Sequence, residues 1–357
     1  MQIEKYLKEY QPIIYKTFLN SLKEKKLSHA YLISGNPGTP LLEVAKFLAK
    51  SILCDDPSPL ACNNCITCLR VDDENYPDFI VLDGSKNSIK KKDVGEIESR
   101  FEKKAFESKG IMIYVLHLVE NMTTEAVNSI LKFLEEPESD IYAFLTTNNE
   151  SIILPTIVSR CQVLHLKQID RNEVIEKAVE EGVDRKDAEL LSYFYNSPEL
   201  VSDALLTKEI IKKPNDDEKD RVEEYNKEVE IHNEIKEAFL EAREILEGFL
   251  ETLRNEEERE VIYYYQTKII PYLKSKEATR FFLDMLSQVY KDILNIQNNW
   301  AIILTSYQET LFDLAKKLNH VDKDILNILK TRSMINLNVN ISLLLDSLFL
   351  GLIRENI

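Results

Sequence analysis

Short apolar runs alternate with helical patterns over the first 166 residues of the chain. The runs of strand length are Tyr31–Ser34, Phe79–Leu82, Ile111–Leu116, Ile141–Leu145 and Val163–Leu166. Apolar residues at helical spacing lie between several of them, as in Leu41, Val44, Ala45 and Leu48. Strands that alternate with helices predict an α/β domain, with a mostly parallel five-stranded sheet and helices on both faces.

A second helical pattern covers residues 126–134. Thr123 is placed to cap its N-terminus, and Glu125 lies near the positive end of the helix dipole. Pro137 is expected to stop this helix, because proline lacks the backbone N–H that a continuing helix needs.

Beyond Leu166 the strand pattern fades and helical patterns take over. Short helices are expected over Glu173–Glu181, Asp187–Tyr195 and Pro198–Leu205. The charged run Lys212–Glu218 contains Pro214 and is interpreted as a linker or boundary. From Asp220 to the end, long apolar stripes at helical spacing predict helices that pack on one another.

Composition and charge limit the classes of protein that fit. The 357 residues are 44% hydrophobic and 30% charged, as in soluble proteins of two or three domains. No run approaches the ~20 apolar residues of a membrane span, and the N-terminus does not resemble a signal peptide, so a cytoplasmic protein is expected. The net charge of −16 argues against a protein that grips DNA over its whole surface, although a local basic patch is compatible with it.

Four of the five cysteines fall within fifteen residues: Cys54, Cys62, Cys65 and Cys68. Thiolates are preferred zinc ligands, and cysteines two residues apart can turn around one ion. In a reducing cytosol such a cluster indicates a structural Zn²⁺ site more often than disulfides. The alternative is a chance cluster of free thiols. Cys161 is distant in sequence and is expected to pack as a small hydrophobic residue.

The loop after the first predicted strand has the context of a phosphate-binding loop but lacks its chemistry. It runs from Gly35 through Gly38 and Thr39 to Pro40, Leu41 and Leu42. A Walker A loop would have a glycine, a lysine and a serine or threonine at the last three of these positions. Proline offers no N–H to a phosphate, and leucine supplies neither charge nor hydroxyl. We therefore interpret the loop as degenerate and expect no ATP there; a plain strand-to-helix turn is the alternative.

The end of the predicted strand Ile111–Leu116 lacks the acidic residues of an NTPase. His117 and Leu118 stand where carboxylates would hold magnesium and prepare the attacking water. Glu120 and Glu125 lie near in sequence but out of register. A structural role is the simpler interpretation of His117, and hydrolysis by this chain is not expected.

A single arginine, Arg160, stands between Ser159 and Cys161. It follows the polar residues 146–149, which come after a predicted strand, where ligands sit in open α/β sheets. Alone, Arg160 is weak evidence for function. The alternative is an ion pair within the chain, with a carboxylate such as Glu135 or Glu136.

Several sequence motifs, in this order, resemble the clamp-loader family of AAA+ proteins. They are SHAYLISG, the four-cysteine insertion, NSILKFLEEPES, FLTTNN, LPTIVSRC and, near the C-terminus, Asn338–Asn340 with LLLDSLFLGL. The resemblance covers about residues 1–170 and the far C-terminus, while residues 208–330 match little. It implies an AAA+ nucleotide-binding-like domain at 1–167 with a zinc module at 54–68, a helical lid domain at 168–208 and a helical collar (oligomerisation) domain at 209–357.

The resemblance also implies a role. The chain would be a non-hydrolysing subunit that helps to load a ring-shaped sliding clamp onto primed DNA at the replication fork. Its partners would be tau/gamma-type motor subunits and a delta subunit in a five-membered ring, with no membrane involved. It would belong to the DNA polymerase III holoenzyme without ATPase or polymerase activity of its own. Arg160 would act in trans as an arginine finger on a neighbour's nucleotide.

Two other functions are compatible with the residues. The first is a divergent AAA+ ATPase whose loop tolerates Pro40 and Leu41, which a nucleotide-binding measurement would detect. The second is a zinc-dependent nucleic-acid binder, against which the acidic charge and the lack of a basic-aromatic face argue.

Overall fold

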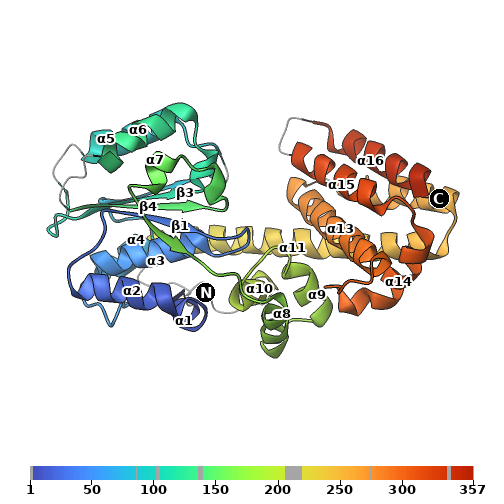
Figure 1. Ribbon diagram of the computed structural model, residues 1–357, viewed down its shortest axis with the longest axis horizontal. Helices are drawn as coiled ribbons and strands as arrows, with labels where there is room; N and C mark the ends of the chain where they lie inside the picture. Colours follow the sequence, from blue (N-terminus) through green and yellow to red (C-terminus); the bar gives the residue numbers. More distant parts are fainter. Residues whose placement is uncertain are drawn as a thin grey trace. The chain divides into compact units, whose positions relative to one another are not determined.

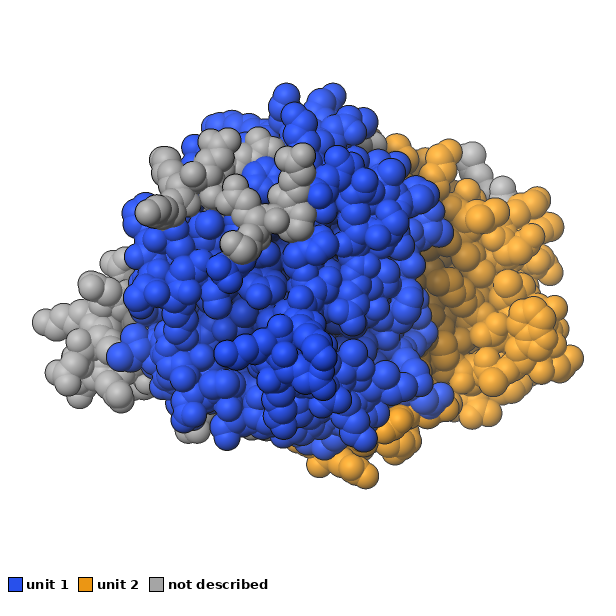
Figure 2. All heavy atoms as spheres, turned by 60° about the vertical axis from the view of Figure 1, so that its left-hand side comes forward, with its two compact units in different colours: residues 1–170 blue, residues 171–357 orange. Residues whose placement is uncertain are grey.

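The computed structural model describes residues 3–85, 87–101, 105–135, 140–205, 219–273, 275–335 and 339–356 (Figure 1). The chain divides into two compact units, Met1–Asp170 and Arg171–Ile357, which Figure 2 colours separately. Three features of the sequence lie outside the described residues: the helix stop at Pro137, the linker Lys212–Glu218, and Asn338. The predicted division into lid at 168–208 and collar at 209–357 stays a prediction.

Unit 1 is built on a parallel five-stranded sheet in the order β2-β3-β4-β1-β5. Its strands are β1 (Ala30–Ser34), β2 (Phe79–Asp83), β3 (Met112–His117), β4 (Ile141–Thr147) and β5 (Gln162–His165). All five predicted strands are confirmed, with ends that differ by one or two residues. In register, Leu32 of β1 lies opposite Leu145 of β4 and Val163 of β5.

Helices cover both faces of this sheet, as predicted (Figure 1). They are α1 (Ile3–Tyr10), α2 (Pro12–Lys23), α3 (Leu41–Leu53), α4 (Ile66–Asp72), α5 (Lys91–Phe101), α6 (Thr124–Glu135) and α7 (Pro155–Val158), with short 3-10 turns η1 (Val119–Asn121) and η2 (Glu150–Ile152). Helices α5, α6 and α7 lie on one face, and α1 to α4 on the other. The predicted cap of α6 is confirmed, because the Thr123 hydroxyl accepts a hydrogen bond from the Ala126 N–H at 3.3 Å.

Alternate residues of the central strands supply the two cores of unit 1. On the side of α5 and α6, Leu32 and Leu145 belong to one cluster with Ile97 and Ile130. The neighbouring residues of the same strands face the other way: Tyr31 stacks on Phe144 with ring centroids 5.1 Å apart. Successive side chains of a strand point to opposite faces of the sheet. Burying one side chain of this size contributes ~1.5–3 kcal/mol relative to leaving it exposed, so both faces of these central strands favour apolar residues.

The regular secondary structure in the described residues of unit 2 consists of helices. Its helices are α8 (Arg171–Glu180), α9 (Arg185–Leu191), α10 (Pro198–Leu205), α11 (Lys219–Asn255), α12 (Glu258–Tyr264), α13 (Lys276–Gln297), α14 (Gln308–Lys317), α15 (Val321–Met334) and α16 (Ile341–Asn356), with a π-helical turn η3 (Tyr265–Ile269) and a 3-10 turn η4 (Thr305–Tyr307). No described helix is long and apolar enough to span a membrane.

The predicted helices Glu173–Glu181 and Asp187–Tyr195 of unit 2 have different ends, and the second differs more. The expected helix Asp187–Tyr195 is α9, which begins earlier, at Arg185, and ends at Leu191. It begins there because the Asp184 side chain caps it, accepting a hydrogen bond from the Lys186 N–H at 2.9 Å. Beyond its end, Phe194 packs edge-on against Phe281, with centroids 5.0 Å apart. Tertiary packing therefore replaces the last predicted turn.

Candidate functional site

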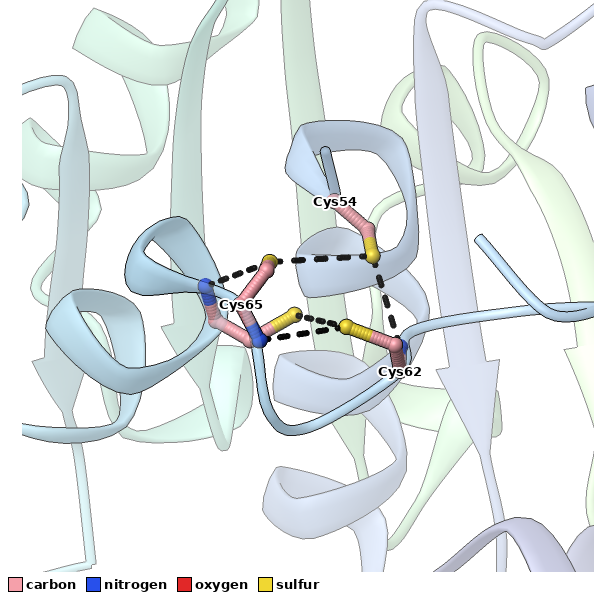
Figure 3. Close-up of side chains that lie close together, drawn as sticks. Cys54, Cys62 and Cys65 are labelled. Atoms are coloured by element: carbon pink, nitrogen blue, oxygen red, sulfur yellow. Dashed lines mark hydrogen bonds between the residues drawn. The ribbon is translucent and has the colours of Figure 1, made fainter. Parts of the chain in front are cut away.

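The four clustered cysteines converge on one point at the end of α3. Cys54 follows α3, Cys62 and Cys65 lie in the loop, and Cys68 is in α4. Their sulfur atoms all lie within 4.8 Å of one another (Figure 3). The Cys54–Cys65 and Cys62–Cys68 sulfur distances are 3.9 and 4.0 Å. Tetrahedral zinc with Zn–S bonds of ~2.3 Å requires sulfurs ~3.8 Å apart, so the donor set has the size and chemistry of a structural zinc site.

Backbone N–H groups point at the sulfurs of this cluster. The Cys62 N–H donates to Cys54 Sγ at 3.3 Å, and the Cys65 N–H donates to Cys62 Sγ at 3.3 Å. Backbone hydrogen bonds, the largest from Asn64, lower the pKa of Cys62 to about 7, whereas burial raises the pKa of Cys54 and Cys68. Donors of this kind stabilise thiolates, the form in which cysteine binds a metal.

Polar contacts fasten the cysteine loop to the sheet domain. Asp55 pairs with Lys109 at 2.6 Å and accepts a hydrogen bond from the Thr67 N–H at 3.4 Å. The hydrogen bond from Lys109 holds the pKa of Asp55 at about 2. The Ser51 hydroxyl, in α3, accepts a hydrogen bond from the Ala61 N–H at 3.0 Å. The cluster is therefore anchored at both α3 and the 105–109 segment.

The residues of the loop between β1 and α3 bond to and pack on one another. Leu41 is 1% exposed, and a methyl group on Gly35 would lie 3.1 Å from its Cδ2 atom. The N–H groups of Thr39 and Leu41 donate to Asn36 and Thr39 carbonyls, at 3.1 and 2.7 Å. Gly38 has a φ of 86°, which favours glycine, and Pro40 has no N–H. Two amides of this loop are thus occupied internally, and an apolar side chain packs on its first glycine.

His117 is part of the framework at the end of β3. Its Nδ1 lies 2.8 Å from the Thr146 hydroxyl, which also accepts a hydrogen bond from the Leu118 N–H at 3.0 Å. Burial lowers the pKa of His117, so the imidazole is neutral at neutral pH. The nearby Glu120 accepts a hydrogen bond from the Asn148 N–H at 2.8 Å. These contacts agree with the structural role that the sequence suggested for His117.

Arg160 follows α7 and folds back over it. Its Nη1 donates to the Thr156 carbonyl at 2.8 Å, and its Nη2 lies 2.9 Å from Glu135 Oε1 at the end of α6. The arginine side chain is 32% exposed and the glutamate side chain 49%. The ion pair with Glu135 considered from sequence is therefore present, while Glu136 lies outside the described residues. The contact with Thr156 could not be foreseen, because a backbone acceptor has no sequence signature.

Two large apolar residues of the segment before Arg160 lie at the surface. Ile152 is 59% exposed and Leu154 is 44% exposed, just before α7. In the sequence both belong to the apolar run Ile152–Leu154, and periodicity alone cannot say that these two side chains face solvent while Ile153 is buried. Cys161, by contrast, packs against the core cluster on the α6 side, and burial raises its pKa to about 12.

Comparison with known proteins places the chain in a family. Over 352 residues it is 30% identical to the DNA polymerase III subunit delta' of Bacillus subtilis (strain 168), with 98% of each chain covered. The chain belongs to the delta' family of DNA polymerase III clamp-loader subunits. The family described as "DNA polymerase III, delta subunit" matches residues 10–170 of it. This confirms the resemblance read from the motifs, and the parallel five-stranded sheet confirms the predicted α/β domain.

Other similar proteins share only part of the chain or only its fold. The DNA polymerase III subunit tau of Bacillus subtilis is 33% identical over 200 residues, which are 54% of this chain and 34% of tau. A DNA polymerase III gamma subunit-related protein of Thermotoga maritima has a TM-score of 0.48 at 19% identity, covering 95% of this chain and 98% of its own. That score is too low to support a functional argument.

Proposed function

We propose that this delta'-type chain does not hydrolyse ATP and instead supplies Arg160 to the nucleotide site of a neighbouring motor subunit while the assembled ring loads a sliding clamp onto primed DNA. The observation that carries the proposal is the contrast within unit 1. Arg160 is partly exposed after α7, while the chain's own phosphate loop is packed by Leu41. Arg160 is therefore suited to bind a phosphate, while the loop of its own domain lacks the residues that would hold one.

The chain's own loop argues against hydrolysis. Phosphoryl transfer depends on a lysine and a metal ion to balance the charge of the phosphates. Leu41 is buried at the lysine position, and the N–H groups of Thr39 and Leu41 are used inside the loop. His117, neutral and bonded to Thr146, stands where a metal-binding carboxylate would be needed.

Arginine is suited to act on a neighbour. Its guanidinium stays charged and presents a planar fork that meets two phosphate oxygens at once. In well-studied cases an arginine finger accelerates hydrolysis by ~10³–10⁵. Ile152 and Leu154, in the segment that precedes Arg160, are exposed apolar side chains that a docking subunit would cover.

We further infer that Cys54, Cys62, Cys65 and Cys68 hold one structural Zn²⁺. Four protein ligands leave no open position for a substrate, so a zinc ion here would stabilise the fold of residues 54–68 rather than take part in a reaction. The lysine-anchored Asp55 and the N–H···S contacts are the surroundings such a site requires.

The partners follow from the family. We propose tau/gamma-type motor subunits and a delta subunit as neighbours in a five-membered ring, in the cytoplasm at the replication fork. In that ring residues 168–208 would act as the lid and residues 209–357 as the oligomerisation collar. Exposed leucines such as Leu326, Leu329 and Leu343 on α15 and α16 support a collar role, because apolar helix faces need a partner.

The Arg160→Ala substitution in a reconstituted ring tests the proposal. We expect the variant chain to fold and assemble, and the DNA-stimulated ATPase and clamp loading to fall partially, because one motor site faces this subunit. Arg160→Lys should not restore the rate. The matched control is Arg185→Ala, which removes another exposed arginine paired to a glutamate, Glu176, in α8. Wild-type ATPase and loading rates with Arg160→Ala would show that Arg160 is structural.

The ATPase alternative is tested on the isolated chain. We expect neither tight ATP binding nor measurable hydrolysis, because the loop lacks both lysine and metal ligands. Micromolar affinity in a calorimetric titration would overturn this and support a divergent ATPase.

A further inference from the structure

Arg160 does not point freely away from its own domain. It is held by two acceptors of the same chain, the Glu135 carboxylate and the Thr156 carbonyl. We propose that Glu135 holds Arg160 in a retracted position until a neighbour's phosphate displaces the carboxylate. Glu135 is then a positioning residue that restrains the finger. This inference rests on the finger role proposed above.

The direction of the side chain supports retraction. Arg160 follows the last turn of α7, and its Nη1 reaches back to the carbonyl of Thr156, four residues earlier. Its Nη2 reaches across to the end of α6, which packs beside α7 (Figure 1). An arginine reaching into another subunit would have to leave both acceptors.

The two bonded nitrogens belong to the fork that would bind phosphate. A guanidinium meets a carboxylate and a phosphate with the same planar geometry, so the two anions compete for the same atoms. A terminal phosphate carries more charge than a carboxylate and is the stronger competitor. Glu135 therefore occupies the finger in the absence of nucleotide and yields it when nucleotide is present.

The strength of the pair suits release. Both side chains are partly exposed, 32% for Arg160 and 49% for Glu135. Exposed ion pairs are weak, which corresponds to at most about a fivefold preference for the paired state. Such a pair biases the arginine without locking it.

The experiment compares Glu135→Gln with wild type in the reconstituted ring, with ATP as the probe. The Glu135–Arg160 pair stabilises the ring before nucleotide binds but is absent from the transition state, and such an interaction lowers kcat/KM. Its removal should therefore raise kcat/KM for ATP by up to about fivefold at the site that faces this subunit. The gain should vanish when Arg160→Ala is added, because no finger is then left to release. Glu125→Gln, which removes one exposed charge from the first turn of the same helix, is the matched control and should change nothing.

A second measurement reads the contact in the isolated chain. Nitrogen-15 NMR of the Arg160 guanidinium should show restricted rotation in wild type and faster rotation in Glu135→Gln. Together these two results support the proposal. An unchanged or lowered kcat/KM for Glu135→Gln, with Arg160→Ala still impaired, overturns retraction and leaves the finger role standing. A fully active ring with Arg160→Ala overturns both.

Discussion

At the scale of single residues, Gly84 shows how closely two backbone segments approach in unit 1. A methyl group on Gly84 would lie 2.7 Å from the His117 carbonyl oxygen and 2.9 Å from that of Leu118. Both are backbone atoms and cannot rotate away. The Gly84 N–H also donates to the His117 carbonyl at 2.9 Å, so the approach is part of the hydrogen bonding that follows β2.

Substitution at Gly84 should therefore be costly. We expect Gly84→Ala to lower the free energy of unfolding by ~1–3 kcal/mol, because backbone must move to accept the methyl group. Gly95, inside α5, is the matched control, since nothing lies within 4 Å of an added methyl group there. Gly95→Ala should raise the free energy of unfolding by ~0.5–1 kcal/mol. Urea denaturation measures both, and equal effects would contradict this account.

His117 gives unit 1 a dependence on pH. Burial holds its pKa below the ordinary value of 6.5, so the unfolded chain binds the proton more readily than the folded one. Its contribution to stability is complete above the unfolded pKa and is lost as pH falls through 6.5 toward the folded pKa. The difference in unfolding free energy between wild type and His117→Gln should thus shrink between about pH 8 and about pH 5. A difference that grows over this range would refute a neutral, partly buried histidine at this position.

At the scale of elements, local periodicity predicts where each strand lies in the chain but not which strands are neighbours in the sheet. The strands β1 to β5 were predictable because each is a short apolar run. Their order was not, because β1 lies between β4 and β5, and no local pattern specifies strand neighbours. The ends of α9 depend on the Asp184 cap and on Phe281, which lies in a distant helix.

The candidate sites divide in the same way. The cysteine cluster was readable because its ligands are close in sequence and its chemistry follows from residue type. The contact of His117 with Thr146 depends on β3 lying beside β4. Arg160 and Glu135 are 25 residues apart, so sequence could offer the pair only as one alternative.

The cysteine module is the element whose stability we expect to depend on a metal. Protein purified without chelator should contain close to one equivalent of zinc. Cys65→Ala should abolish binding and unfold residues 54–68 while the sheet remains, because zinc supplies most of the folding energy of such small modules. Cys65 also caps α4, accepting a hydrogen bond from the Cys68 N–H at 3.4 Å.

A control separates metal loss from loss of a buried thiol. Cys161→Ala removes a cysteine that packs against the core and lies outside the cluster, so it should keep the full zinc content. Elemental analysis and thiol titration measure the outcome. Free titration of the four clustered cysteines in wild type, with no zinc, would rule out the site.

At the scale of the whole molecule, charge and domain structure bear on how the chain would work in a ring. A net charge of −16 is unfavourable for binding DNA phosphates over a broad surface. In the role proposed here, most contacts with primed DNA would then come from the partners. In that role the chain would contribute its shape and Arg160, and its function would depend on how firmly its own helices are held together.

Buried carboxylates join the first helices of unit 2 to the later ones. Glu189 of α9 is 1% exposed; it accepts hydrogen bonds from the Thr305 hydroxyl at 2.5 Å and from the Ser306 N–H at 2.9 Å. Asp187, on the same helix, pairs with Arg243 of α11. These contacts link residues of the predicted lid to residues of the predicted collar, so the two should resist unfolding as one body.

We expect Glu189→Gln to lower the stability of unit 2 by ~1–3 kcal/mol, because the amide loses charge-assisted bonds and brings its own N–H groups toward buried donors. Hydrogen exchange should show α8 to α10 and α13 to α14 losing protection together, with β1 to β5 unchanged. Glu176→Gln, which breaks an exposed pair with Arg185, should have little effect. Loss of protection confined to α8–α10 would mean that the lid unfolds independently, and that a ring containing this chain could move its lid apart from its collar.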